Sequence, residues 1–120
     1  MLPRNARLTS PSDFAKTTKS GVRVTSRNFV GYLYIQSNVT TPARAGLIIG
    51  KSVGGSVVRH RLSRQVRHAI APQISILPEG SLLVIRALKA DGRVAEEITS
   101  LIASLITRHE KITRKSEASI

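Results

Sequence analysis

The sequence predicts an α+β sandwich in which helices pack on a mixed β-sheet. Two observations support this prediction. Apolar residues recur at spacings of three and four in residues 54–71 and 92–108, as one face of a helix requires. Residues 28–36 and 81–87 are instead short aromatic or apolar runs typical of strands. The expected order is helix, two or three strands, helix, strand and helix, in one domain spanning residues 1–120.

A start signal predicts the first helix. Residues 1–9 are polar and contain two arginines, so we expect an extended basic arm. Residues 10–13 read Ser-Pro-Ser-Asp, with a hydroxyl at the cap, proline at the first helical position and an acid in the first turn. The helix should end at about Lys19, before Gly21. Phe14 is its only large apolar side chain, so the helix must pack against another element to be stable.

Residues 22–25 and 28–36 are the next expected strands. In the longer one, alternation places Tyr32 and Tyr34 on one face with Val30. Two interpretations of these tyrosines stay open. They are either a platform on which nucleobases stack or ordinary half-buried strand residues.

Residues 45–49 predict a further strand, which leads into Gly50-Lys51-Ser52. A phosphate-binding loop would need a glycine five residues before Gly50, where Ala45 stands, so a nucleotide site is rejected. Lys51 then remains as one more cation. After the turn-rich residues 72–80, residues 81–87 are expected to form a central strand.

An amphipathic helix is predicted over residues 54–71. The apolar stripe comprises Val58, Leu62, Val66, Ala69 and Ile70. The opposite side carries His60, Arg61, Arg64, Arg67 and His68, while Arg59 sits at the edge. No carboxylate stands at helical spacing to offset these charges, and like charges repel at that spacing. Because guanidinium groups match phosphates, the helix is expected to bind a polyanion rather than face solvent.

The last helix is expected from about residue 92 to Arg108, followed by a polar tail over residues 110–120 that frays. Net charge is +12, and residues 1–78 hold twelve Lys or Arg against the single acid Asp13. The N-terminal two-thirds should therefore form the anion-binding surface. With no cysteine, no signal-peptide core and no apolar run long enough for a membrane span, we expect a soluble cytoplasmic protein.

The residues offer no catalytic site of their own. A nuclease needs clustered carboxylates for metal or a paired acid and base, and the first 78 residues contain one carboxylate. His60 and His68 are eight residues apart, more than about 10 Å along a helix, so they suit hydrogen bonding or stacking on RNA instead. The prediction is a nucleic-acid-binding protein without an active site.

The chain resembles the bacterial ribonuclease P protein component. The resemblance rests on Asp13-Phe14, Asn28-Phe29 with Tyr32, Gly46-Leu47, Lys51, Gly54, and the run Val57-x-Arg59-x-Arg61-x-x-Arg64-x-x-Arg67. It covers about residues 4–110, and the arginine helix is its most specific part. It implies an αβββαβα two-layer sandwich of the ribosomal protein S5 domain 2-like fold, with an uncommon left-handed crossover.

The resemblance also implies a function. The chain would be the protein subunit of an endoribonuclease that removes the 5′ leader from precursor tRNA, while the catalytic RNA subunit performs the Mg²⁺-dependent hydrolysis. Mg²⁺ would be held mainly by the RNA subunit and the substrate. The protein would bind no membrane and would need no obligate protein partner. The RNA-subunit contacts would be Lys51, Arg59, His60, Arg61, Arg64, Arg67 and His68. The leader cleft would include Phe14, Thr18, Tyr32 and Tyr34.

Three residues depart from that family's pattern. His60 replaces a central asparagine, Ser63 replaces a lysine, and Thr18 replaces a second aromatic residue of the first helix. Loss of one stacking ring at Thr18 would weaken leader binding by about 1–3 kcal/mol. Charge and size alone would also suit a structural RNA-binding protein such as a ribosomal protein, and a metal-dependent nuclease is disfavoured by the scarcity of carboxylates.

Overall fold

A computed structural model describes the backbone of residues 6–118 and the side chains of residues 6–112. The helices and strands are α1 (Pro11–Ser20), β1 (Val22–Thr25), β2 (Phe29–Ile35), β3 (Arg44–Ile48), α2 (Ser56–Ile70), β4 (Ser81–Ala87) and α3 (Val94–Ala118), with short 3₁₀ helices η2 (Lys51–Val53) and η3 (Ala71–Ile76) on either side of α2. The predicted order of helices and strands is confirmed.

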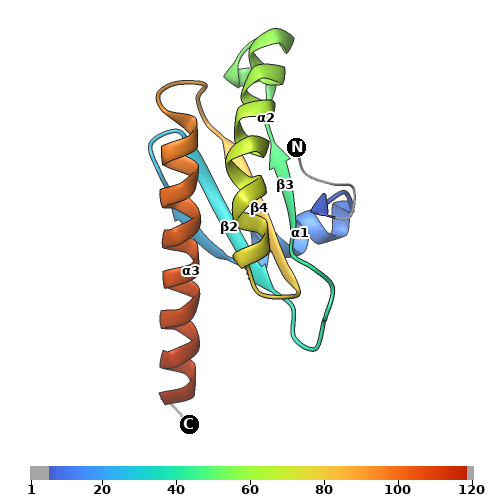
Figure 1. Ribbon diagram of the computed structural model, residues 1–120, viewed down its shortest axis with the longest axis vertical. Helices are drawn as coiled ribbons and strands as arrows, with labels where there is room; N and C mark the ends of the chain where they lie inside the picture. Colours follow the sequence, from blue (N-terminus) through green and yellow to red (C-terminus); the bar gives the residue numbers. More distant parts are fainter. Residues whose placement is uncertain (1–5, 119–120) are drawn as a thin grey trace.

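The four strands form one mixed sheet in the order β1-β2-β4-β3 (Figure 1). β2 pairs antiparallel with β1 and β4, whereas β3 pairs parallel with β4. A parallel pair needs a crossover connection, and α2 supplies it here. The α+β class with a mixed sheet is therefore confirmed, while the left hand of the crossover stays a prediction.

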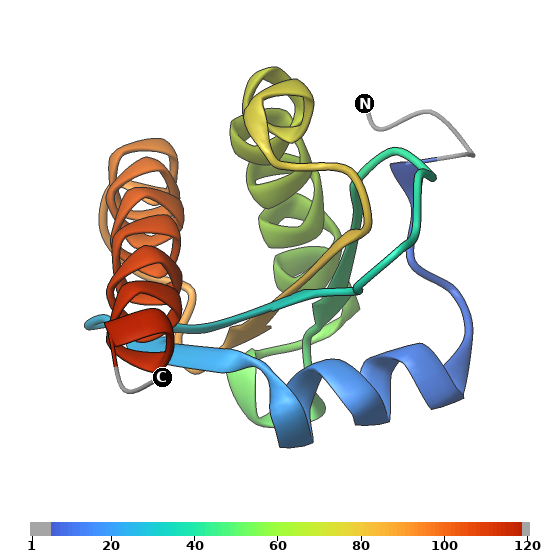
Figure 2. The same ribbon diagram turned by 90° about the horizontal axis from the view of Figure 1, so that it is seen from below.

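The main core lies between the sheet and the pair α2 and α3, which run side by side over one face (Figures 1 and 2). Its fully buried side chains include Phe29, Leu33, Leu62, Leu83, Ile85, Ile98 and Leu105. Gly31 brings α3 close to β2, because a Cβ there would lie 2.7 Å from Leu105 Cδ1. Its lack of a side chain thus sets the spacing between these two layers.

The opposite sheet face is covered in part by α1 (Figure 2). Its smaller apolar cluster contains Leu8, Val30, Tyr32, Leu82 and Val84, with Phe14, Tyr34 and Ile48 packed partly buried against it. The predicted alternation of β2 is confirmed, since Phe29 and Leu33 belong to one face and Val30 and Tyr32 to the other.

Residues 6–9 of the expected basic arm run beside β3. Leu8 is 4% exposed, and its backbone N–H donates a 2.8 Å hydrogen bond to the carbonyl of Ala45. Arg7 forms an isolated parallel bridge with the same residue. Part of the arm is thus joined to the edge of the sheet, while residues 1–5 lie outside the described residues.

The final helix is longer than predicted. α3 begins at Val94 and continues to Ala118, so the predicted end at Arg108 is wrong. The fraying expected for residues 110–120 stays a prediction, and residues 119–120 lie outside the described residues. None of the described helices is both long and apolar enough to cross a membrane.

Asn28 joins three segments at one end of the sheet. It is 2% exposed, and its side-chain amide donates to Glu97 Oε1 at 2.8 Å and to the carbonyl of Asp91 at 3.0 Å. The Asn28 backbone N–H donates to Glu97 Oε2 at 2.7 Å, and the Ser26 hydroxyl donates to the same oxygen. The start of β2 is thereby tied to the first turns of α3.

Candidate nucleic-acid interface

α2 separates an apolar side from a cationic side. Its buried residues are Leu62, Val66, Ala69 and Ile70. On the other side His60, Arg61, Arg64 and His68 are exposed, while Arg59 and Arg67 are half-buried. The predicted segregation of these residues, including the edge position of Arg59, is confirmed. We call these six cationic and imidazole side chains the arginine face.

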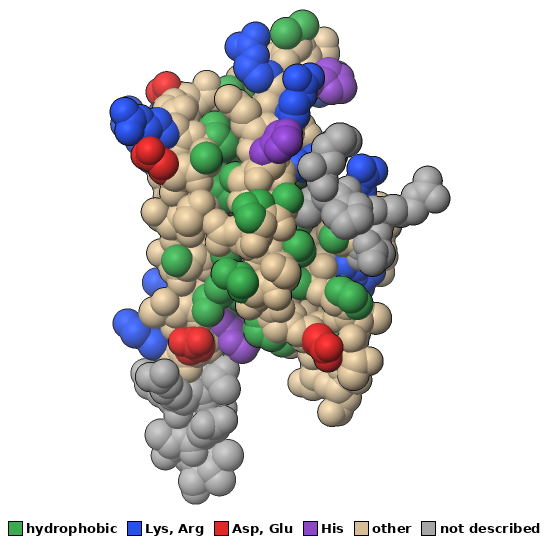
Figure 3. Space-filling model, viewed as in Figure 1, with side chains coloured by type: hydrophobic (Ala, Val, Ile, Leu, Met, Phe, Trp, Pro, Cys, Tyr) green, Lys and Arg blue, Asp and Glu red, His purple; other side chains and the backbone are tan. Residues whose placement is uncertain are grey.

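The arginine face lacks a counter-charge among the side chains of residues 6–112. Arg44 and Asp13 form an ion pair at 3.6 Å, as do Arg93 and Glu96 at 3.4 Å, and neither pair involves α2. Figure 3 shows Lys, Arg and His side chains gathered over one end of α2, with no acidic side chain among them. Asp13, the single acid of residues 1–78, is engaged by a cation of β3 instead.

Two hollows border the arginine face. One, of about 360 Å³, lies between β3 and α2 and is lined by Leu47, Ile49, Ser56, Arg59, His60, Ser63 and Arg67. The other, of about 270 Å³, is lined by His60, Ser63, Arg64, Arg67 and His68. Nε of Arg59 is buried and has no hydrogen-bond partner among the described residues. The cationic surface is therefore recessed rather than flat, and one of its donors is unused.

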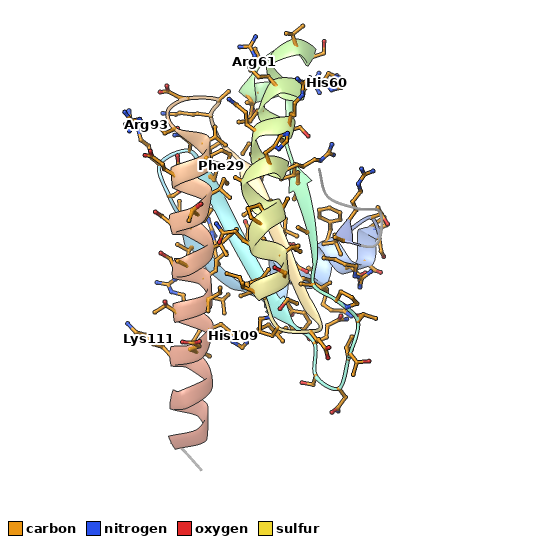
Figure 4. The ribbon with its side chains drawn as sticks, viewed as in Figure 1. Phe29, His60, Arg61, Arg93, His109 and Lys111 are labelled. Carbon is orange, nitrogen blue, oxygen red and sulfur yellow. The ribbon has the colours of Figure 1, made fainter. Side chains whose placement is uncertain are left out.

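Lys51 lies near the N-terminal end of α2. It is exposed in η2, which precedes α2, and the N-cap residue of α2, Gly55, provides no side-chain cap. His60 and Arg61 project to either side of α2 near this end (Figure 4). Backbone N–H groups at a helix start carry partial positive charge, which adds to that of the side chains. The strongest positive potential is thus expected at the start of α2.

The expected cleft residues lie on the α1 side of the sheet. Phe14, Tyr32 and Tyr34 belong to one apolar cluster, as the prediction requires. Tyr32 is only 8% exposed, so its ring offers little surface to a nucleobase, whereas Phe14 and Tyr34 are half-buried at the margin. The Thr18 hydroxyl donates to the carbonyl of Phe14 at 3.0 Å, so this side chain is turned back on its own helix.

A third hollow brings the two sides of the interface together. It measures about 270 Å³ and is lined by Arg7, Leu8, Thr9, Phe14, Ala45, Gly46, Leu47, Arg67 and Ile70. Leu47 and Arg67 also line the hollow beside α2. The α1 side and the arginine face therefore adjoin each other along the edge strand β3.

Comparison with known proteins decides the family. The family model described as Ribonuclease P matches residues 2–110. The chain belongs to the ribonuclease P protein family. As such it is a component of ribonuclease P with a role in tRNA processing, and its partner is the RNA of that enzyme. Family membership decides between this role and the ribosomal protein that charge and size also allowed.

Two relatives illustrate how far the similarity to known ribonuclease P proteins extends. The chain is 43% identical over 111 residues to the ribonuclease P protein component of Mycobacteroides abscessus, covering 88% of this chain and 82% of that protein. It is 39% identical over 90 residues to that of Acidothermus cellulolyticus, covering 75% of each. The fold matches the solved RNase P protein of Staphylococcus aureus with a TM-score of 0.70 at 21% identity, over 87% of this chain and 94% of that one.

Two further residues of this ribonuclease P protein were not predicted as site residues. Arg86 is exposed on β4 and pairs in register with Val30, which places it on the α1 face of the sheet. The sequence held a signal for it, because Arg86 is the single charged residue of an apolar strand and alternation assigns its face. Ser63 lines two hollows of the arginine face, and only its departure from the family pattern drew attention to it.

Proposed function

We propose that this ribonuclease P protein docks the catalytic RNA subunit on the arginine face of α2 and guides the 5′ leader of precursor tRNA along the α1 side of the sheet. The observation that carries the proposal is the uncompensated charge of α2. Four arginines and two histidines share one side of a helix with no ion pair among the described side chains. Phosphates of a folded RNA would supply the missing negative charge.

The leader path is supported by the chemistry of the α1 side. Phe14 and Tyr34 present partly exposed rings on which unpaired bases can stack, while Tyr32 supports them from within the cluster. Arg86 adds an exposed cation on the same sheet face. A single strand could run from Phe14 to the arginine face, because Phe14 lines the same hollow as Leu47 and Arg67.

Hydrolysis is assigned to the RNA subunit, with Mg²⁺ held mainly by RNA and substrate. The metal-ligating side chains of the protein support this division of roles between RNA and protein. Within the part of the chain that the structure describes, no three His, Asp or Glu side chains gather where they could hold a metal ion. Asp13, Glu96 and Glu97 are engaged with Arg44, Arg93 and Asn28. The protein's contribution would be binding and positioning.

Reconstitution with a bacterial ribonuclease P RNA tests the proposal. At low Mg²⁺ the protein should accelerate cleavage of precursor tRNA at the mature 5′ end, because its cations replace part of the charge screening that Mg²⁺ supplies. RNA-free protein should leave the substrate intact. If adding the protein leaves the cleavage rate of the RNA subunit unchanged at every Mg²⁺ concentration, the proposal is wrong.

A further inference from the structure

Ser63 is a short side chain on the β3 side of the arginine face. It is half-buried and stands one helical turn from Arg59 on one side and from Arg67 on the other. Both of those arginines line the hollow of about 360 Å³ between β3 and α2, as Ser63 does. Because Ser63 is short, the space between the two guanidinium-bearing chains stays open. We call this space the Ser63 recess.

The Ser63 recess combines an apolar wall with cations. Leu47 and Ile49, two residues apart on β3 and its continuation, contribute the apolar wall. Arg59, His60 and Arg67 contribute the charged or polar groups, and no acidic residue lines the space. The volume falls in the range of about 300–1,000 Å³ that is usual for small-ligand pockets. Such a lining suits a flat, weakly polar group with a negative charge attached to it.

A nucleotide of RNA has this chemistry. Its base is planar and largely apolar on its faces, and its phosphate is held by guanidinium groups. Arg59 and Arg67 both line the recess, so their guanidinium groups are available to a phosphate bound at its margin. Bases that are unpaired in a folded RNA can be splayed out into such pockets.

We propose that the Ser63 recess binds one unpaired nucleobase of RNA, with the base against Leu47 and Ile49 and its phosphate against Arg59 and Arg67. The inference rests on the proposed RNA-binding role of α2 and adds a base-dependent contact to it. A purely electrostatic surface would bind the sugar-phosphate backbone alone. The recess makes affinity depend on whether bases are present.

Ser63→Lys separates the two possibilities, because they predict different effects on strands with and without bases. If only charge matters, an added cation on the arginine face tightens binding to any polyanion. If the recess holds a base, the long lysine side chain fills the space and the contribution of the base is lost. Gln65→Lys is the matched control, since Gln65 is exposed on the same helix and does not line the recess.

The experiment measures binding of the full chain to two single-stranded probes, a short oligouridylate and an oligoadenylate, each against a ribose-phosphate strand of equal length without bases. The quantity of interest is the affinity for the strand with bases divided by that for the strand without them. Ser63→Lys should lower this ratio by about fivefold or more for at least one probe, the lower end of what one bound base contributes. Ser63→Ala, which keeps the recess open, and Gln65→Lys should leave it unchanged.

Ser63→Gln fills the recess without adding charge and should also lower the ratio, so the test does not depend on one variant folding. An equal ratio in wild type, Ser63→Lys and Ser63→Gln would overturn the inference, as would a wild-type ratio of one. The proposed function is tested by a different outcome. If the protein does not accelerate precursor-tRNA cleavage but the ratio still falls in the filled variants, the recess binds a base although the protein does not assist cleavage as proposed.

Discussion

Phe14 Cζ occupies space that a side chain at residue 46 would need, because a Cβ on Gly46 would stand 2.4 Å from that atom. Gly46 lies in β3, opposite Val84 in the parallel register, and Phe14 lies in α1. The absence of a side chain on the strand therefore lets the aromatic ring approach the sheet. This contact sets the distance between the Phe14 ring and the sheet at the margin of the proposed leader path.

Gly46→Ala should destabilise the fold. Displacing the ring should cost about 1–3 kcal/mol of unfolding free energy, which outweighs the gain of about 0.4–1 kcal/mol from a less flexible unfolded chain. Urea denaturation measures the difference. Gly50→Ala is the control, because its nearest non-neighbouring atom would be Ser52 Oγ at 3.9 Å. A neutral Gly46→Ala would show that Phe14 shifts freely.

The contact between Asn28 and Glu97 predicts a second stability effect. Glu97→Gln replaces one carboxylate oxygen, which accepts hydrogen bonds from buried groups, with an amide that donates instead. We expect a loss of about 1–3 kcal/mol of unfolding free energy. Glu96→Gln should change it by no more than about 0.5 kcal/mol, because the ion pair of Glu96 with Arg93 is exposed. Equal effects of the two substitutions would contradict this account.

The same carboxylate predicts a pH dependence. Partial burial by itself raises the pKa of Glu97, but hydrogen bonds from Ser26 and Asn28 and the charge of Arg27 outweigh it, so the pKa lies below the ordinary value of glutamate. Such a group stabilises the fold fully above its unfolded pKa of about 4.3, and this contribution is lost as pH falls through the folded value.

The stability difference between wild type and Glu97→Gln should therefore be constant near neutral pH and shrink in acid. Urea denaturation of both proteins across a pH series measures it. The comparison cancels the other carboxylates, which titrate alike in both proteins. A difference that persists until the wild type unfolds in acid would mean that Glu97 is not held ionised by its partners.

Arg61→Ala and Arg64→Ala should each weaken binding of the RNA subunit and flatten its salt dependence. Each lost phosphate contact should reduce the slope of log affinity against log salt concentration by about 0.7–0.9. Arg93→Ala, which removes an exposed cation just before α3 that is already paired with Glu96, should leave the slope unchanged. An unaltered slope in the α2 variants would show that those guanidiniums face solvent in the complex.

Local patterns predicted α2 well because its two sides differ over several turns of a single segment. The period of three and four in its apolar residues, and the lack of acids between its arginines, are both visible in consecutive residues. The alternation of β2 was predictable for the same reason. The orientation of the arginine face follows from such patterns alone once the apolar side is buried.

Contacts between distant segments were not predictable in this way. Asn28 and Glu97 are separated by most of the chain, and neither carries a local sign of its partner. The close approach of Phe14 to Gly46 likewise depends on how α1 crosses the sheet. The end of α3 was misplaced because the apolar stripe fades near Arg108, although a helix can continue on residues of sufficient local propensity.

A probe tethered to single cysteines tests the orientation of the protein on its RNA most directly. The chain contains no cysteine, so Val57→Cys and Ser100→Cys each provide one attachment point for an iron chelate that generates hydroxyl radicals. Val57 is 70% exposed on the same side of α2 as Arg61 and Arg64, and Ser100 is exposed on α3. Both labelled proteins should still accelerate precursor-tRNA cleavage. The account predicts localised cleavage of the RNA subunit from residue 57 and none from residue 100, and the reverse pattern would contradict docking through the arginine face.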